Sequence, residues 1–364
     1  MAVVTDHRRC DCGVRADLIE KPRAKGRLET MASSGRHVLI TGAGMLGAHT
    51  ARVFLACGWD VTLVDRALQY DYLQDILGND ERVTTVQVDL GEEAATDAAL
   101  SGLRADVVVN TAALVAARAQ LNPILTLDIN VKMPLRLAQW AHAAGAERFV
   151  TIGSWGIYAP DQPKRITEDA ALMSPHVSHY GASKAAMEQV LGAFASASGL
   201  KVLVIRPTII YGYGPNLGGS IASAILEDLV VSAIRGEDVT IPQSMTSESE
   251  YTYVGDVANA VFGAATYNLD AVFDVFNAGS QETTSTAQFA AVLRNLFPDA
   301  TISEAPRDDT LFGPPRQKWA TDVSRNIELL KTPVPLTITD GLARFIDDLR
   351  RATNVDRVTS MTWR

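Results

Sequence analysis

The chain has 364 residues, of which 47% are hydrophobic and 21% charged, and its formal net charge is −9. A chain of this length can bury a sizeable core in one large domain or in two unequal ones. The acidic balance, with no block of lysine and arginine, argues against a nucleic-acid partner. No apolar run approaches the roughly 20 residues that cross a membrane, so no membrane association is expected.

Residues 1–35 form a polar leader without the apolar segment of a secretory signal. We interpret this leader as disordered, with Met31 as an alternative start of the protein. Cys10 and Cys12 lie in it, and Cys57 is the third cysteine. Three cysteines cannot build a disulfide framework, which favours a reducing, cytoplasmic location. Their spacing is not typical of zinc ligands, and no metal site is predicted.

From residue 36 onward, short apolar strands alternate with helical segments. Strands are predicted at 37–41, 60–65, 83–88, 106–110, 148–153 and 201–206, and helices at 45–57, 121–144 and 179–197. This alternation predicts an α/β fold, a Rossmann-type doubly wound parallel sheet covered by helices on both faces. After Pro207 the alternation is lost. We therefore expect a Rossmann domain at 36–207 and a smaller, interleaved region at 208–364, mostly for substrate binding, with segments that return to the first domain.

A glycine-rich turn joins the first predicted strand to the first predicted helix. Gly42, Gly44 and Gly47 fit the pattern G-x-G-x-x-G, with Met45 and Leu46 before the last glycine. The first glycine permits a tight turn, the second admits a pyrophosphate, and the third lets helix and strand pack closely. The start of the helix offers N–H groups and a positive dipole to phosphates. The turn therefore predicts that the domain at 36–207 binds a dinucleotide.

Asp65 ends the second predicted strand, 18 residues after Gly47. A carboxylate here can accept hydrogen bonds from both ribose hydroxyls and would repel a 2′-phosphate, so NAD is predicted rather than NADP. Arg66 follows directly and could soften this preference, and a plain surface role for Asp65 is the alternative. Asp89 and Leu90 follow the third strand, where they would meet the adenine, although Asp89 could equally belong to an ordinary turn.

Tyr180 and Lys184 are four residues apart and would share one face of a helix. A phenol ionises near pH ~10, and a neighbouring ammonium or an oxidised nicotinamide would lower the pKa of Tyr180 enough for acid/base catalysis. Lys184 could also hold the nicotinamide ribose. Ser154 ends the fifth strand, where its hydroxyl could orient the substrate oxygen that Tyr180 protonates. The alternative is a Tyr–Lys pair on a helix surface.

These motifs resemble the extended short-chain dehydrogenase/reductase family, the NAD-dependent epimerase/dehydratase group. The resemblance runs from residue 37 to about residue 347 and includes the glycine turn together with Ser154, Tyr180 and Lys184. The other matching residues are Asn110-Thr111-Ala112-Ala113, Asn130-Val131, Tyr158, Glu188, Arg206-Pro207-Thr208, Tyr211-Gly212, Tyr253-Val254-Gly255-Asp256-Val257-Ala258 and Phe276-Asn277-Ala278-Gly279.

The resemblance implies NAD as the cofactor and the same Ser, Tyr and Lys as the catalytic residues. It implies that Thr111, Ala112, Ala113 and the Pro207 backbone also contact the cofactor, with Pro207 near the nicotinamide amide. It places Thr208 near the substrate. It further implies a homodimer formed by the two long helices.

Three departures from the family pattern narrow the expected chemistry. The glycine turn is one residue shorter than the usual G-x-x-G-x-x-G. Family dehydratases carry Asp-Glu after a catalytic Thr, but Trp155 and Gly156 follow Ser154 here, so elimination of water lacks an obvious acid and base. Trp155 is expected either to form a wall of the substrate site or simply to pack.

Glu248 and Glu250 precede the Tyr-Val-Gly-Asp-Val segment, where many nucleotide-sugar enzymes have an arginine, and they would repel a diphosphate.

The sequence therefore predicts an NAD-dependent oxidoreductase or epimerase that acts on a hydroxyl of a sugar or sugar derivative. One alternative is a simple sugar or sugar-acid dehydrogenase, or a carbonyl reductase, without epimerisation. The other is a non-catalytic NAD-binding protein, which would not need the complete set of three catalytic residues.

Overall fold

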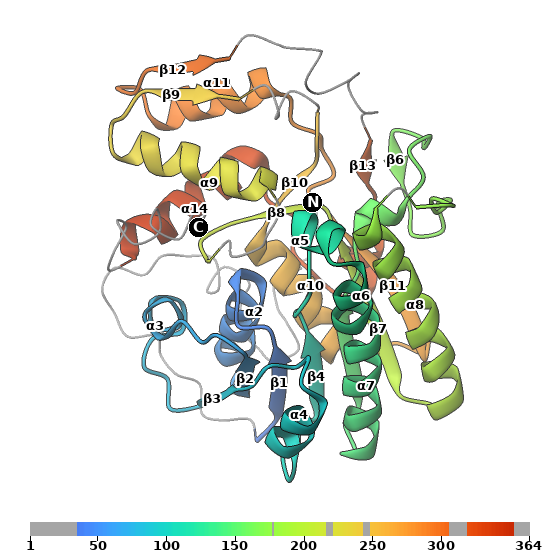
Figure 1. Cartoon of the computed structure of the whole chain (residues 1–364). Coiled ribbons are helices and arrows are strands. Elements are labelled where there is room, and N and C mark those ends of the chain that lie inside the picture. The colour runs from blue at the N-terminus through green and yellow to red at the C-terminus, as the bar shows by residue number, and fades with distance from the viewer. Residues whose placement is uncertain (1–34, 177, 216–220, 243–247, 306–318, 353–364) are drawn as a thin grey trace, which may run out of the picture.

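The computed structural model describes residues 35–176, 178–215, 221–242, 248–305 and 319–352 (Figure 1). The predicted leader, with Met31 and its two cysteines, lies outside these residues except for its last residue. Within the described ranges, no helix combines the length and the apolar character needed to cross a membrane. In the same ranges, no three His, Cys, Asp or Glu side chains are grouped so that they could hold a metal ion.

A seven-stranded parallel sheet forms the centre of the molecule (Figure 1), in the order β11-β7-β5-β4-β1-β2-β3. Its strands are β1 (His37–Thr41), β2 (Asp60–Asp65), β3 (Val83–Gln87), β4 (Val107–Asn110), β5 (Arg148–Ile152), β7 (Lys201–Pro207) and β11 (Phe273–Ala278). The predicted fold class is confirmed, and all six predicted strands are present. The seventh, β11, comes from the chain after Pro207 and pairs with β7.

Helices cover both faces of this sheet and create two hydrophobic cores. The side chains of β1 alternate between them, since Val38 and Ile40 belong to one core and Leu39 to the other. The first core packs under α2 (Met45–Ala56), α3 (Tyr70–Leu77) and α10 (Val254–Thr266), and the second under α4 (Glu93–Leu100), α7 (Met133–Ala143) and α8 (His179–Ser198). Burial on both faces explains why the central strands are apolar throughout.

The long helix predicted at 121–144 is divided into shorter pieces. It consists of α5 (Ala116–Leu121), α6 (Pro123–Leu127), a π-helical turn (Asp128–Lys132) and α7. Pro123 begins α6, where its missing N–H costs no helical hydrogen bond. The wider π turn contains Asn130, which is fully buried. The prediction of one continuous helix was therefore wrong at this turn and at Asn122.

Three two-stranded parallel sheets and several helices complete the described structure, and all of their elements except β6 come from the chain after residue 207. The sheets pair β8 (Ile209–Tyr211) with β10 (Tyr251–Tyr253), β9 (Val239–Ile241) with β12 (Ile302–Glu304), and β6 (Arg165–Ile166) with β13 (Ala320–Thr321). The helices are α9 (Ile221–Ile234), α11 (Thr286–Leu296), α13 (Ser324–Leu329) and α14 (Ile338–Arg351). Figure 1 shows α9, α11, β9 and β12 gathered above the Rossmann sheet, and β6 and β13 together above α8.

A buried polar network fastens this later region to the first Rossmann helix. His49 Nε2 on α2 lies 2.9 Å from the carbonyl oxygen of Tyr213, in the loop after β8. Arg52, one turn further along α2, lies 3.6 Å from the carboxylate of Asp348 on α14. The Tyr253 hydroxyl donates to the same carboxylate at 2.8 Å. The helix that follows the glycine turn is thus held by residues from three later segments.

Candidate active site

The glycine turn lies at the carboxyl end of β1, where α2 begins. Gly42 has φ +89°, a conformation that favours glycine, and its N–H donates to the Val64 carbonyl at 2.8 Å. The Thr111 hydroxyl fastens the turn from β4, because it lies 2.9 Å from the carbonyl oxygens of both Thr41 and Gly42. Thr111, which the family resemblance associates with the cofactor, therefore also shapes the protein side of the turn.

Two glycines of the motif are required for different reasons. A Cβ at Gly47 would overlap the carbonyl oxygen of Gly42, whereas a Cβ at Gly44 would meet no other atom within 4 Å. Gly44 is the N-cap of α2, and no side chain caps the first N–H groups with a hydrogen bond, so these groups keep no partner within the helix. Open space in front of a helix start fits the diphosphate of a dinucleotide. Met45 and Leu46, which follow, are half-buried against the first core.

Asp65 lies directly against this turn. One carboxylate oxygen accepts the Ala43 N–H at 2.7 Å and the other accepts the Ala67 N–H at 3.0 Å. The side chain is half-buried at the end of β2, on the edge of the sheet that carries the glycine turn. This position suits a contact with the cofactor ribose and also braces the turn from the neighbouring strand.

The other residues predicted to bind the cofactor, including Asp89 and Leu90 near the adenine, lie at the same end of the sheet. Arg66 and Asp89 are both exposed, and their charged groups are 4.0 Å apart. Leu90 is half-buried against the second core. Ala112 and Ala113, in the loop after β4, are also half-buried. Arg66 thus faces a carboxylate, so its charge is partly compensated.

The three predicted catalytic residues meet at the end of β5. Tyr180 and Lys184 are one turn apart near the start of α8, and the Lys184 Nζ lies 5.9 Å from the centroid of the Tyr180 ring. Lys184 is buried, and its Nζ donates to the Ile152 carbonyl at 2.7 Å. The Tyr180 phenol and the buried Ser154 hydroxyl share a hydrogen bond. Helical spacing and the strand end therefore bring all three side chains together.

The charge states of this group are set mainly by burial. In the protein without its cofactor, burial raises the pKa of Tyr180, and the hydrogen bond with Ser154 lowers it only in part. The lowering of this pKa by Lys184 and an oxidised nicotinamide stays a prediction for the protein with NAD bound. Burial lowers the pKa of Lys184 to about 8, while the charge of Glu188 raises it. Lys184 therefore stays mostly protonated at neutral pH.

Asn130 positions the catalytic helix, a role that the sequence analysis did not assign. Its Oδ1 accepts the Leu114 N–H, and its Nδ2 donates to the Leu114 carbonyl, both at 2.8 Å. Its Nδ2 also lies 3.0 Å from the Ser183 hydroxyl, which donates to the Tyr180 carbonyl at 2.8 Å. One amide thus links the loop after β4 to the first turn of α8. The available signal was Asn130-Val131, which the sequence matched to the family pattern without a role.

A buried ion pair holds the next turn of α8 against the sheet. Arg206 on β7 donates to both oxygens of Glu188, at 2.9 and 2.5 Å. Its remaining terminal nitrogen donates to the Tyr158 hydroxyl at 2.8 Å and to the Glu168 carbonyl at 3.0 Å. Glu188 and Tyr158 had been identified only through the family resemblance. The pair fixes the distance between the catalytic helix and the strand that ends at Pro207.

Pro207, predicted near the nicotinamide amide, and the predicted substrate residues Thr208 and Trp155 are buried or half-buried. Pro207 is buried at the end of β7 and pairs with Ala278 of β11. The buried Thr208 hydroxyl lies 2.5 Å from the Thr252 hydroxyl, so it already has a partner within the protein. Trp155 is half-buried and packs edge-on against Trp319, so the packing that was one of its two expected roles is present.

The predicted repulsion of a diphosphate by Glu250 is wrong. Glu250 is fully buried, and its carboxylate accepts the N–H groups of Gln281 at 2.6 Å and Thr321 at 2.8 Å. Burial raises its pKa to about 7, although these hydrogen bonds lower it. Glu250 therefore joins three chain segments and is not exposed to a ligand. Glu248 is half-buried, and its carboxylate accepts the Thr283 hydroxyl at 3.3 Å.

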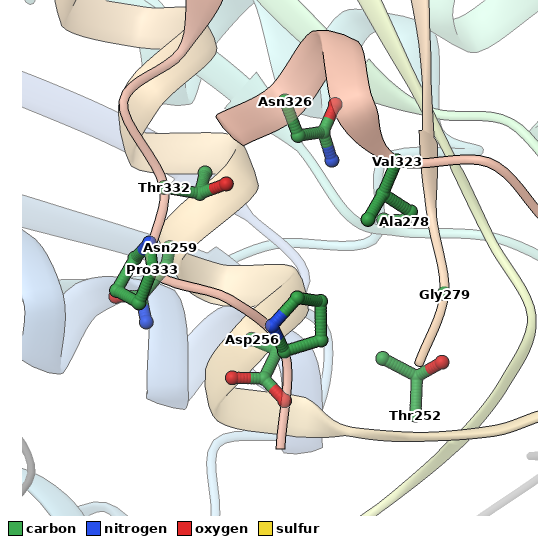
Figure 2. A pocket seen from close by; sticks show the side chains of 10 residues that line it. Thr252, Asp256, Asn259, Ala278, Gly279, Val323, Asn326, Thr332 and Pro333 are labelled. Carbon is green, nitrogen blue, oxygen red and sulfur yellow. The ribbon is translucent and has the colours of Figure 1, made fainter. Parts of the chain in front are cut away.

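Figure 2 shows a small pocket next to the end of β11, between α10 and α13. The Oδ1 of Asn326 is buried there without a hydrogen-bond partner, and its Nδ2 donates to the Asn277 carbonyl at 2.6 Å. The lining residues are Thr252, Asp256, Asn259, Ala278, Gly279, Val323, Asn326, Thr332, Pro333 and Pro335. The predicted catalytic and cofactor residues are not among them, so this pocket is separate from the catalytic group.

The NAD dependent epimerase/dehydratase family model matches residues 38–279, which include the glycine turn, Asp65 and all three catalytic candidates. The chain belongs to this family. The predicted family membership is thus confirmed, and NAD is the cofactor.

Individual members of the family are similar over different lengths. UDP-glucose 4-epimerase of Mycolicibacterium smegmatis is 26% identical over 324 residues, which cover 86% of this chain and 98% of that protein. UDP-glucose 4-epimerase of Caenorhabditis elegans is 29% identical over 168 residues, which cover 43% of this chain and only 48% of that protein. Among solved structures, MoeE5 in complex with UDP-glucuronic acid and NAD has a TM-score of 0.69 and 26% identity, covering 86% of this chain and 99% of that chain.

Proposed function

We propose that this protein is an NAD-dependent epimerase or oxidoreductase acting on a ring hydroxyl of a sugar nucleotide, with Tyr180 as the general acid/base. The observation that carries the proposal is the meeting of Ser154, Tyr180 and Lys184 at the sheet edge that bears the glycine turn. A hydroxyl, a phenol and an ammonium in this arrangement can bind an alcohol oxygen and move its proton.

The proposed proton transfer uses contacts that already exist in the protein. With NAD bound and Tyr180 ionised, a substrate hydroxyl placed between Ser154 and Tyr180 would donate its proton to the phenolate as its carbon gives up a hydride, for which NAD would supply the acceptor. Lys184, held by the Ile152 carbonyl, stabilises the phenolate through its charge. In an epimerase, the ketone would turn in the site, its other face would regain the hydride from the reduced cofactor, and Tyr180 would return the proton to the oxygen.

Elimination of water is not part of this proposal. A dehydratase needs a second acid/base pair near the reacting oxygen. The two positions after Ser154 are Trp155 and Gly156, neither of which carries an ionisable group. Epimerisation and simple oxidation need only one proton carrier, which Tyr180 provides.

Two kinds of support point to a UDP-sugar as the substrate. The M. smegmatis relative, which this chain matches over nearly its full length, is a UDP-glucose 4-epimerase, and MoeE5 binds UDP-glucuronic acid and UDP-glucose together with NAD. In addition, the burial of Glu250 removes one electrostatic objection to a diphosphate.

The test is to incubate the purified protein and NAD with UDP-glucose, UDP-galactose, UDP-glucuronic acid and the free sugars. Isomerised sugar nucleotide without accumulated NADH identifies an epimerase, whereas stoichiometric NADH identifies a dehydrogenase. Tyr180→Phe should lower kcat by about 10²- to 10⁴-fold and leave the Kd for NAD unchanged.

Tyr70→Phe, at an exposed tyrosine on α3, serves as the matched control and should retain full activity. Full turnover by Tyr180→Phe would refute the proposed mechanism, and turnover of the free sugars alone would refute the sugar-nucleotide substrate.

We also propose that the protein forms a homodimer through the segment at α5 and α6. Four large apolar side chains are exposed there, namely Leu121, Ile124, Leu125 and Leu127, and the first two are 79% and 71% exposed. This segment lies next to α8, so a second copy would bury the apolar side chains beside the catalytic helix. Exposed apolar groups concentrated on one short segment are typical of a protein interface.

A further inference from the structure

A third hydrophobic cluster lies immediately beyond the catalytic serine. It is separate from the two cores of the sheet and consists of Tyr158, Ile166 and Trp319, with Trp155 and Ala170 packed against it. Trp155 belongs to the short 3₁₀ turn Trp155–Ile157 that follows Ser154, and Ile166 to β6. The pairing of β6 with β13, visible above α8 in Figure 1, brings Trp319 to this turn.

Trp155 is held firmly in this cluster but is not fully enclosed. The Ser154 hydroxyl accepts the Gly156 N–H at 3.1 Å, which closes the turn around Trp155. The rings of Trp155 and Trp319 meet edge to face, with centroids 4.9 Å apart and planes at 74°. Trp319 is only 8% exposed, and its indole N–H donates to the Pro160 carbonyl at 3.3 Å. A supported indole with part of its surface open thus stands next to the catalytic serine.

Trp155 follows Ser154 directly in the chain and keeps part of its side chain accessible. Adjacent Cα atoms are about 3.8 Å apart, so the backbone of Trp155 begins within one residue's length of a ligand bonded to Ser154. The face of an indole carries negative partial charge and binds apolar C–H surface. A carboxylate against that face would lose its hydration without gaining a partner, which is costly.

The charges around the cluster add to this discrimination. The Arg206 guanidinium, 5.0 Å from the Tyr158 ring, is already paired with both oxygens of Glu188. The Glu168 carboxyl accepts the Asn277 N–H at 2.8 Å and lies 3.9 Å from Arg325, while the Glu168 backbone carbonyl accepts a hydrogen bond from Arg206. A carboxylate brought to Arg206 by a ligand would therefore meet a guanidinium that is already paired with Glu188.

We propose that Trp155, supported by Trp319, forms the wall against which the sugar ring lies, and that this wall selects a neutral hexose over a uronic acid. The inference rests on the proposed function and names the substrate class within it. A uronic acid differs from the neutral sugar by a carboxylate in place of a hydroxymethyl group on the ring, so the wall discriminates through a single substituent.

The test compares UDP-glucose with UDP-glucuronic acid on the NAD-loaded protein, by steady-state kinetics and by calorimetric Kd. In the unaltered protein, kcat/KM for UDP-glucose should exceed that for UDP-glucuronic acid at least about tenfold. Trp155→Ala should bring this ratio towards one, mainly by raising KM for UDP-glucose. Trp155→Phe keeps an aromatic face and should largely keep the ratio.

Trp140→Ala provides the matched control, because it removes a half-buried indole from α7 without touching the cluster, and it should leave the ratio unchanged. Circular dichroism and the Kd for NAD report whether each variant is folded. If Trp155→Ala does not fold, Trp155→Arg provides a second test, since a cation at this position should raise the affinity for UDP-glucuronic acid.

A preference for UDP-glucuronic acid in the unaltered protein, or a ratio that is the same in folded Trp155→Ala, would refute the selective wall while leaving the proposed function intact. If neither nucleotide binds or reacts, the sugar-nucleotide function is refuted and the wall with it.

Discussion

Asp65 illustrates how one side chain can serve both the fold and the cofactor. Its two oxygens accept backbone N–H groups from Ala43 in the glycine turn and Ala67 after β2. A carboxylate has about four acceptor positions, so these bonds leave capacity for ribose hydroxyls. The same negative charge close to the turn disfavours a 2′-phosphate.

Replacing Asp65 by Ala is therefore expected to raise the Kd for NAD about tenfold and to lower the preference for NAD over NADP. Calorimetric titration with both dinucleotides measures the two effects. Glu81→Ala, at an exposed carboxylate before β3, is the control and should change neither. An unchanged ratio of the two dissociation constants in Asp65→Ala would show that Asp65 is not the ribose ligand.

The grouping of Ser154, Tyr180 and Lys184 that the sequence predicted depends on local spacing. Tyr180 and Lys184 face one another because residues four apart in a helix share a face, and Ser154 meets them because it ends a central strand. Glu250 could not be understood in this way. Its burial depends on Gln281 and Thr321, which are 31 and 71 residues away in the chain. The residues around Glu250 in the sequence do not predict these contacts.

At the scale of elements, α2 is tied to the loop after β8 by His49, whose charge state depends on that packing. Burial and the neighbouring Arg52 lower the pKa of His49 to about 3. An unfolded chain binds a proton at His49 below pH 6.5, while the folded chain stays neutral down to about pH 3. The contribution of His49 is therefore fully present above pH 6.5 and is lost as the pH falls towards 3.

His49→Gln should remove this dependence, since an amide can donate to the Tyr213 carbonyl but does not titrate. Relative to the variant, the unaltered protein should lose up to about 5 kcal/mol of unfolding free energy between pH 6.5 and 3. Urea unfolding across this range measures the difference. His142→Gln, at an exposed histidine on α7, should leave the pH profile unchanged, and parallel curves for His49→Gln and the unaltered protein would contradict the prediction.

Elements were predictable where their own residues determine them. The six predicted Rossmann strands are apolar runs that need no partner to be recognised. By contrast, β6 and β13 have two residues each and exist only through mutual pairing across more than 150 residues. The π turn before α7 likewise depends on Asn130 bonding to Leu114 and Ser183, so the periodicity of the helix alone did not reveal it.

At the scale of the whole molecule, the catalytic group stands near one of its most exposed apolar segments. The backbone N–H of His179, the first residue of α8, donates to the Gln120 side chain at 3.1 Å. Leu121 directly follows Gln120 in the chain. A partner that covers α5 and α6 would therefore also steady the start of the catalytic helix. This contact links the proposed assembly to the arrangement of the active site.

Ile124→Asp is accordingly expected to convert a dimer to a monomer, because it would place a charge in the buried centre of the proposed interface. Size-exclusion chromatography with light scattering distinguishes a mass near twice 39.1 kDa from a single chain. Leu329→Asp, at an exposed leucine on α13, should not change the mass. A monomeric unaltered protein, or a dimeric Ile124→Asp, would exclude the proposed interface.

Gly44 and Gly47 belong to the same short motif, but their different surroundings show that they are needed for different reasons. Gly47 is required by the protein itself, since any larger residue would push the Gly42 carbonyl out of its place. Gly44 has room for a side chain as far as the protein is concerned, so its smallness serves only what approaches from outside. Within the same turn, one glycine is thus constrained by folding and the other by access for the ligand.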